Sequence, residues 1–262
     1  MSDPLSLFHG DCLEVLPTLP ETSFDAIVTD PPYGQTNEDY DSPIAFNPAL
    51  WKACFRVAKP GAVLMAFCGS PTYHRMASAI EAAGWKIRQM WAWIYRDGVI
   101  TSAWPKEGFD RLAPAMDPIC YATKGKAVLN LEREGMNSWV RPESSRILRT
   151  LRTYSNRASR AGICKGQGHW PRTVIADENI SDFEYFALSR TRGGQSEKCG
   201  HPNQKPVRLM RWLVSKVQGE SVLDPFAGAG STGVACHEER KRFVGVEQNR
   251  EYFEMARQRL DR

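Results

Sequence analysis

The run VLDPFAGAGSTG at residues 222–233 leaves few folds open to this chain. An apolar stretch of strand type leads directly into a glycine-rich turn, and a helical pattern follows the turn. Glycine lets a backbone approach a ligand closely, and the first turn of a helix offers amide groups that have no partner within the helix. The run therefore predicts a strand, turn and helix of an open α/β sheet, with a ligand at the turn.

Glu247 ends the next predicted strand, seventeen positions after Gly230. An acid there can accept hydrogen bonds from both hydroxyls of a ribose and would repel a 2′-phosphate. The turn lacks the lysine of a nucleoside-triphosphate cradle, which argues against ATP or GTP. A nucleoside cofactor is therefore favoured, while two alternatives stay open: glycines that serve only tight packing, and a dehydrogenase, since GAGSTG keeps a glycine in its last place.

The hydrophobic pattern outside this run alternates between strand and helix. Strands are predicted at 5–8, 24–29, 62–68, 87–95, 118–123, 221–223 and 242–247. Helices are predicted around Leu13 and Leu16, at 47–58, 71–84 and 206–217, from the glycine turn to about residue 239, and at 250–260. This alternation predicts an α/β fold with a doubly wound, mostly parallel, seven-stranded sheet.

The tetrapeptide Asp30-Pro31-Pro32-Tyr33 follows the second predicted strand, where ligand chemistry is usual in such sheets. Two prolines make a rigid turn that has few donors and leaves its carbonyl groups free to accept. An aromatic amine offers two N–H groups, and its lone pair becomes nucleophilic only when the nitrogen becomes more tetrahedral. The Asp30 carboxylate and the Pro31 carbonyl can each accept one N–H and favour that geometry. Taken alone, the tetrapeptide favours a plain turn with a packing tyrosine, but its occurrence together with the glycine turn reverses this preference.

Composition sets the broad class of the protein. The chain has 262 residues, 42% of them hydrophobic, and lacks any apolar run long enough for a membrane span. The first residues lack the pattern of a secretory signal, so a cytoplasmic protein without a membrane partner is expected. Seven scattered cysteines indicate reduced thiols. The spacing of Cys164, His169, Cys199 and His201 is irregular for zinc, so we expect no metal.

Positive charge is concentrated in one segment. Eight Arg and Lys residues lie between Arg133 and Lys165 against two acids, an excess larger than the net charge of +4 of the whole chain. Residues 125–200 also lose hydrophobic periodicity, as expected of an insert. Arg146, Arg149, Arg152 and Arg160 lie near one face if this part is helical, which suits a nucleic-acid backbone, although a solvated helix face is the alternative.

Several motifs, in their order, resemble the beta group of DNA amino-methyltransferases, in which the catalytic motif precedes the cofactor motif. The matching segments are FHGDCLEVLPTLP, FDAIVTDPPYG, KPGAVLMAF, PICYATKG, HPNQKPVRLMRWLV, VLDPFAGAGSTGVAC and RFVGVEQNREYFEMARQRL. Asn203 stands where the family commonly has threonine, and a second threonine after the glycine turn is missing. For the strand WAWIYR, where relatives often carry tryptophan and lysine, no role is transferred.

The resemblance implies a Rossmann-like class I methyltransferase fold, circularly permuted, with its first and last strands side by side. It divides the chain into a catalytic half at 1–124, a target-recognition insert at 125–200 and a cofactor-binding half at 201–262. The residues implied to bind S-adenosylmethionine are Asp11, Asp30, Lys205, Asp224, Phe226, Gly228, Gly230 and Glu247, with Asp11 near the adenine and Lys205 near the methionine part. The implied catalytic residues are Asp30, Pro31, Pro32 and Tyr33.

The activity implied is methylation of N6 of adenine in double-stranded DNA, with the target base flipped out and stacked on Tyr33. A homodimer is compatible with this activity. Base-reading candidates in the insert are His169, Trp170 and Gln195, each of which also suits plain loop packing. The alternatives are N4 of cytosine, for which relatives more often have serine in place of Asp30, an RNA guanine methyltransferase, and an inactive DNA-binding relative.

Overall fold

The computed structural model describes residues 5–35, 41–94, 116–130, 174–176, 199 and 204–261. The strands are β1 (Leu5–His9), β2 (Phe24–Thr29), β3 (Ala58–Phe67), β4 (Lys86–Ile94), β5 (Met116–Thr123), β6 (Val174–Ala176), β7 (Ser221–Asp224) and β8 (Arg242–Glu247). The α-helices are α1 (Cys12–Val15), α2 (Pro48–Val57), α3 (Tyr73–Ala82), α5 (Val207–Ser215), α6 (Ser231–Glu238) and α7 (Arg250–Leu260). Two short 3-10 helices, η1 (Leu16–Thr18) and η2 (Pro43–Phe46), complete the described elements.

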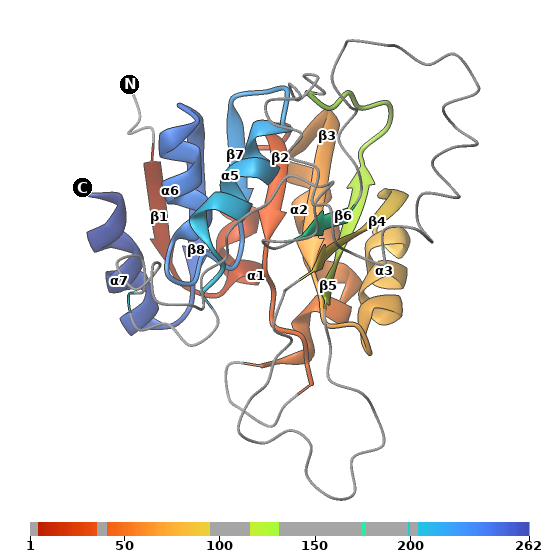
Figure 1. The fold of residues 1–262 in the computed structure, drawn as a ribbon, viewed down its shortest axis with the longest axis horizontal. Coiled ribbons are helices and arrows are strands. Elements are labelled where there is room, and N and C mark those ends of the chain that lie inside the picture. Colours follow the sequence, from red (N-terminus) through yellow and green to blue (C-terminus); the bar gives the residue numbers. More distant parts are fainter. Residues whose placement is uncertain are drawn as a thin grey trace, which may run out of the picture.

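The strands form one sheet in the order β1-β8-β7-β2-β3-β5-β4-β6. Only β5 runs antiparallel to its neighbours among the described strands. Strand β1 pairs with β8, so strands from the two ends of the chain lie side by side, with α7 packed nearby (Figure 1). The predicted doubly wound, permuted and mostly parallel sheet is thereby confirmed.

Helices cover both faces of the sheet because side chains alternate along each strand. In β2, Ile27 packs into a core with α1, α2 and α3, whereas Ala26 and Val28 belong to a second core with α5 and α6. All three residues are fully buried. The continuous apolar run of β2 is thus explained by two buried faces, and the result is a three-layer arrangement (Figure 1).

Two details differ from the sequence-based expectation. The sheet has eight described strands rather than seven, because the three-residue strand β6, inside the predicted insert, pairs with β4. Strand β3 begins at Ala58 rather than Ala62, because Ala58 already pairs with Phe24 before a register shift. Gly61, with a φ of 86°, lies at this irregularity, and its amide donates to the carbonyl of Lys124 at 2.7 Å. A helix to residue 58 and a strand from residue 62 were predicted, whereas one strand runs through this segment with a register shift.

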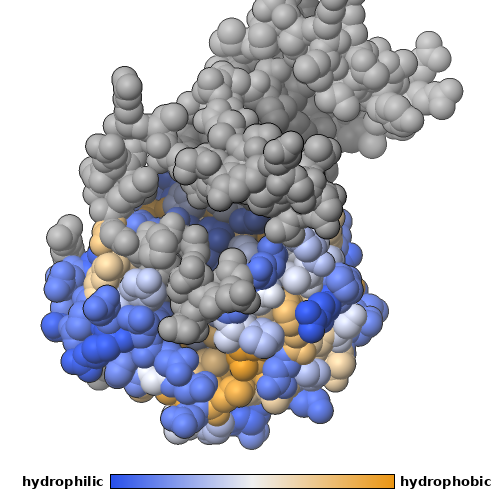
Figure 2. All heavy atoms as spheres, turned by 90° about the horizontal axis from the view of Figure 1, so that it is seen from below, coloured by the Kyte–Doolittle hydropathy of each residue, from blue (hydrophilic) through white to orange (hydrophobic). Residues whose placement is uncertain are grey.

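The sheet reverses its winding between β2 and β7. The chain moves from β2 to β3 in one direction and from β7 to β8 in the other, while β2 and β7 are parallel neighbours. Ligands of open α/β sheets bind at such a point, beyond the carboxyl ends of the strands. These ends lie at the lower edge in Figure 1, and Figure 2, viewed from below, shows a mainly hydrophilic surface interrupted by apolar patches.

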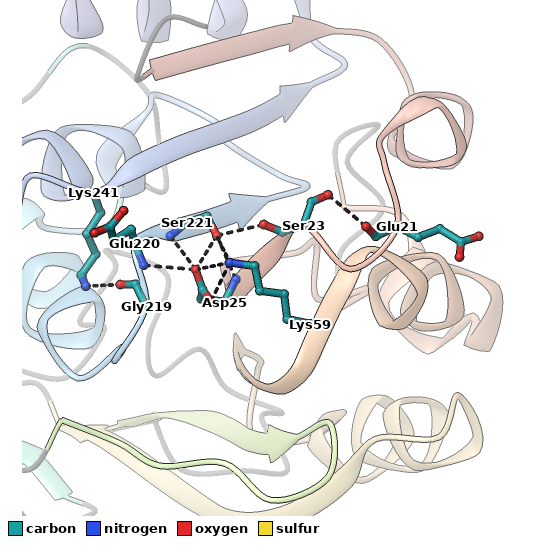
Figure 3. A network of polar contacts seen from close by, with 8 residues as sticks. All are labelled: Glu21, Ser23, Asp25, Lys59, Gly219, Glu220, Ser221 and Lys241. Carbon is teal, nitrogen blue, oxygen red and sulfur yellow. Dashed lines mark hydrogen bonds and ion pairs between the residues drawn. The ribbon is translucent and has the colours of Figure 1, made fainter. Parts of the chain in front are cut away.

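The amino ends of β2 and β7 are joined by a polar network centred on Asp25 (Figure 3). One carboxylate oxygen accepts from the amides of Glu220 and Ser221 and from the hydroxyl of Ser221. Lys59 completes the network, with 2.9 Å to each carboxylate oxygen. Burial raises the pKa of Asp25, but the hydrogen bonds from Ser221 and Lys59 outweigh it and lower the pKa. The network therefore stabilises the end of the sheet opposite the switch point.

No helix within the described ranges is long and apolar enough to cross a membrane. The same residues contain no cluster of His, Cys, Asp and Glu that is suited to a metal ion. Of the four residues considered for zinc, only Cys199 belongs to the described part, and it is a free thiol. The other three, Cys164, His169 and His201, lie outside it.

Candidate active site

The glycine turn follows β7 and leads into α6. Gly228 and Gly230 have φ angles of 52° and 78°, in the left-handed region that favours glycine. Gly230 caps α6, and a Cβ added to it would lie 3.1 Å from the Cβ of Ala256 on α7. Gly228 is therefore required by its backbone conformation, and Gly230 by both its backbone conformation and its close packing against α7.

Glu247, at the end of β8, ties the glycine turn to its neighbour strand. Its two carboxylate oxygens accept from the amides of Gly228 and Asn249, both at 2.8 Å. Burial raises the pKa of Glu247. Each oxygen keeps lone pairs for a further donor, so the carboxylate can still accept ribose hydroxyls. A half-buried acid beside glycine backbone offers the acceptors that the ribose hydroxyls of a nucleoside require.

The environment of Asp224 differs from that of the other predicted cofactor residues. Its carboxylate is buried and accepts from the hydroxyls of Thr29 and Thr232, at 2.7 and 2.5 Å, and from the amide of Phe226 at 3.1 Å. Burial raises its pKa to about 6. With its oxygens bound to these protein donors, the Asp224 carboxylate holds the glycine turn against β2 and α6.

Asp11 and Phe226 lie at the same edge of the sheet. The Asp11 side chain caps α1 and accepts from the amide of Leu13 at 2.7 Å. The preceding amide, of Gly10, donates to the carbonyl of Glu247 at 3.0 Å, which brings Asp11 beside the acid of β8. Phe226 is half-buried against the core that contains α1. The predicted neighbours of the adenosine part thus gather around the ends of β1, β7 and β8.

The Asp-Pro-Pro-Tyr turn follows β2, next to the glycine turn. The parallel register aligns Ala26 with Val222 and Ile27 with Leu223, so the strands end together, and continuing this register brings Asp30 level with Phe226. Neighbouring strands lie about 4.8 Å apart. The two turns therefore open onto the same edge of the sheet, as the predicted methyl transfer between them would require.

The hydroxyl group of Tyr33 is hydrogen-bonded to Asp30 within the same turn. Its hydroxyl donates to Asp30 Oδ1 at 2.8 Å and lies 3.5 Å from Asp117 Oδ2. Burial, followed by the charges of Asp30 and Asp117, raises its pKa well above the ordinary value. The carbonyl of Tyr33 accepts from the hydroxyl of Thr72 at 3.2 Å. The tyrosine is thus a neutral donor that orients the Asp30 carboxylate, while Pro31 is buried and Pro32 half-buried.

Lys205, expected near the methionine part of the cofactor, has its ammonium 2.5 Å from Asp30 Oδ2 and 3.1 Å from the Tyr33 hydroxyl. The rings of Phe67 and Trp93 also face this ammonium, with centroids at 5.1 and 5.8 Å. Sequence reasoning missed Phe67, Trp93 and Asp117. Trp93 lies in the strand to which no role was assigned, and the only available signal was its position in a predicted strand.

The predicted DNA contacts cannot be located. Arg146, Arg149, Arg152 and Arg160 lie outside the described residues, as do His169, Trp170 and Gln195. Their proposed roles remain predictions from the sequence.

Comparison with known proteins gives consistent matches over most of the chain. The family model described as DNA methylase matches residues 24–258. The type II methyltransferase M.HpaI of Haemophilus parainfluenzae is 27% identical over 269 aligned residues, covering 97% of this chain and 74% of that protein. M.HindIII of Haemophilus influenzae is 28% identical, covering 79% of this chain and 65% of that protein. The chain thus spans about two thirds to three quarters of these relatives.

Solved structures share the fold at lower identity. A complex of M1.HpyAVI with SAM is 22% identical, with a TM-score of 0.62, and the match covers 98% of this chain and all of that one. PvuII DNA methyltransferase, described as cytosine-N4-specific, is 17% identical, with a TM-score of 0.68, and the match covers 99% of this chain and 87% of that one. These likenesses support the α/β architecture described above.

Proposed function

This chain belongs to the DNA methylase family and is an S-adenosylmethionine-dependent DNA methyltransferase, and we propose that the atom it methylates is N6 of adenine. The observation that carries the proposal is the half-buried Asp30 carboxylate, which lies at the switch point beside the glycine turn. A carboxylate at this position is a strong acceptor for the N–H groups of an exocyclic amine.

The cofactor is proposed to lie along the ends of β1, β7 and β8. Glu247 would accept from the ribose hydroxyls, Gly228 and Gly230 would let the backbone approach, and Phe226 and Asp11 would flank the adenine. S-adenosylmethionine supplies an electrophilic methyl group on a positively charged sulfur. Asp224 would act indirectly, since its oxygens are already bound to Thr29, Thr232 and Phe226.

The target amine is proposed to bind at Asp30. The carboxylate accepts one N–H and the Pro31 carbonyl accepts the other, which turns the nitrogen lone pair away from the ring and toward the donor. Tyr33 donates to Asp30 Oδ1 and holds the carboxylate in one orientation. Charged hydrogen bonds to a preorganised acceptor are worth about 1.5–3 kcal/mol each, enough to favour the reactive geometry of the amine.

DNA binding is proposed to involve the basic insert at 125–200, between a catalytic half at 1–124 and a cofactor-binding half at 201–262. Its arginines, Arg146, Arg149, Arg152 and Arg160, would contact phosphates of double-stranded DNA. The target base must leave the duplex to reach Asp30, at a cost of a few kcal/mol, which aromatic side chains near the site offset.

The proposal is tested by incubating the protein with DNA and labelled cofactor, followed by nucleoside analysis of the product. N6-methyladenine is expected, because aspartate rather than serine opens the tetrapeptide. N4-methylcytosine would refute the adenine assignment, and an unlabelled product together with undetectable cofactor binding would identify an inactive relative. Sequencing of the labelled positions then defines the recognition site.

A further inference from the structure

The Lys205 ammonium occupies a box formed by one carboxylate and three aromatic rings. Asp30 Oδ2 lies 2.5 Å from the nitrogen, and the Tyr33 hydroxyl lies 3.1 Å away. The ring centroids of Tyr33, Phe67 and Trp93 are at 5.3, 5.1 and 5.8 Å, within cation–π range. The side chain of Lys205 is only 10% exposed, so the box is largely closed to water.

The groups that form this box suit an amine that is undergoing methylation. An exocyclic amine brings N–H donors to a carboxylate, and its nitrogen gains positive charge as the new C–N bond forms. Ring faces and a carboxylate favour a charged N–H donor of this kind over a neutral group without N–H. The lysine ammonium therefore has the properties of the reacting nitrogen, and it bonds the same acceptor, Asp30, that the proposed function assigns to that nitrogen.

Both oxygens of Asp30 are engaged in the structure, Oδ1 by Tyr33 and Oδ2 by Lys205. Tyr33 is held at a second point, since its carbonyl accepts from Thr72, and its ring packs against a buried core. Lys205 instead reaches Asp30 through a flexible four-carbon stem from the segment before α5. An arriving amine is thus expected to take Oδ2 and displace the lysine.

We infer that Lys205 is a positioning residue that competes with the target amine for Asp30. Without substrate it satisfies the Asp30 charge and keeps the aromatic box formed. A base with an exocyclic amine replaces it, whereas a base without one leaves the ion pair in place. This inference rests on amine methylation by the proposed site, and it holds for adenine and cytosine alike.

The experiment measures DNA affinity at the recognition site, with S-adenosylhomocysteine bound so that no reaction occurs. One duplex carries the target adenine, and the other carries purine, which lacks the amine. The ratio of the two dissociation constants reports how much the amine contributes. In Lys205→Met this ratio should favour the adenine duplex about tenfold more than it does in the unmodified protein, because the amine no longer has to displace an ammonium.

Two further variants separate competition from general damage. Lys205→Arg keeps a cation beside Asp30 and should preserve the original ratio within about twofold. Lys59→Met removes a lysine–aspartate pair at the opposite end of the sheet, whose lysine is more exposed than Lys205, and should also leave the ratio unchanged. Thermal unfolding and cofactor-product affinity confirm that each variant is folded.

The inference is overturned if Lys205→Met shows an unchanged or reduced preference for the adenine duplex over the purine duplex. This includes the case in which the variant loses only cofactor affinity. Failure of the proposed function is read separately from the nucleoside analysis. If that analysis returns N4-methylcytosine, the same ratio is measured with cytosine and its analogue lacking the 4-amino group. The competition is then supported or refuted independently of which base is methylated.

Discussion

The Thr29 hydroxyl donates a hydrogen bond of 2.7 Å to Asp224 and so joins the last residue of β2 to the last residue of β7. These two strands carry the proposed amine-binding and cofactor-binding turns. Thr232, on α6, donates to the other oxygen of the same carboxylate at 2.5 Å. One buried acid, bound only to protein donors among the described residues, therefore fixes the distance between the two turns.

Asp224→Asn should change the pH dependence of stability. Burial raises the folded pKa of Asp224 to about 6, against 3.8 for a free aspartate. The unfolded chain loses this proton first, so the aspartate costs stability as pH rises from about 4 to 6. The stability advantage of the native protein over the variant should therefore fall by about 2 kcal/mol between pH 4 and 7, measured by denaturant unfolding.

Asp25→Asn, on the neighbouring strand β2, serves as the matched control. The pKa of Asp25 is lowered on balance, so its ionised form stabilises the fold and this contribution is lost as pH falls below the value of 3.8 for a free aspartate. The stability advantage of the native protein over Asp25→Asn should therefore shrink as pH falls. The advantage over Asp224→Asn should instead shrink as pH rises. The same pH trend for both variants would contradict the two assigned environments.

Asp30→Ala should abolish methyl transfer and leave the fold intact. The variant loses the acceptor for the target amine, and a preorganised group of this kind contributes about a hundredfold or more to rate. Labelled methyl incorporation into DNA measures the loss, and thermal unfolding checks the fold. Substantial retained activity would remove Asp30 from the mechanism.

Glu247→Ala should weaken binding of S-adenosylmethionine by about tenfold to a hundredfold, because a charged acceptor for the ribose is lost. Calorimetry or equilibrium dialysis provides the dissociation constant. Glu254→Ala, a half-exposed acid on α7 that pairs with Arg250 and Arg257, is the control and should bind the cofactor normally. Equal affinities for both variants would move the ribose elsewhere.

Gly230→Ala should destabilise the protein by about 2–4 kcal/mol, from a left-handed backbone and a crowded neighbour on α7. Gly125→Ala is its control, with a φ of 79° but nothing within 4 Å of the added Cβ, and should cost only about 1 kcal/mol. The difference between the two free energies of unfolding isolates the contact with Ala256. A difference near zero would show that α7 shifts freely.

Replacing Arg149 and Arg152 together by alanine should flatten the salt dependence of DNA binding. If both side chains contact phosphates, the slope of log K against log salt should decrease in magnitude by about 2. Fluorescence anisotropy at several salt concentrations measures it. A slope equal to that of the unmodified protein would relocate the DNA surface to another part of the chain.

Local pattern alone predicted most elements of the fold. Strand β8 and helix α7 have the predicted bounds, because a continuous apolar run and an amphipathic repeat are both short-range signals. The three-residue strand β6 was missed, since its strand character depends on pairing with β4 rather than on its own residues. The early start of β3 at Ala58 was missed for the same reason.

The sequence by itself determined the chemistry available at each turn: glycines and an acid for a nucleoside, and a carboxylate with rigid prolines for an amine. Only the tertiary structure decided which of these groups meet. Lys205 and Asp30 are 175 positions apart, and their contact depends on how α5 packs against the sheet. Side-chain contacts over such separations follow from the packing of whole elements, and local composition carries no record of them.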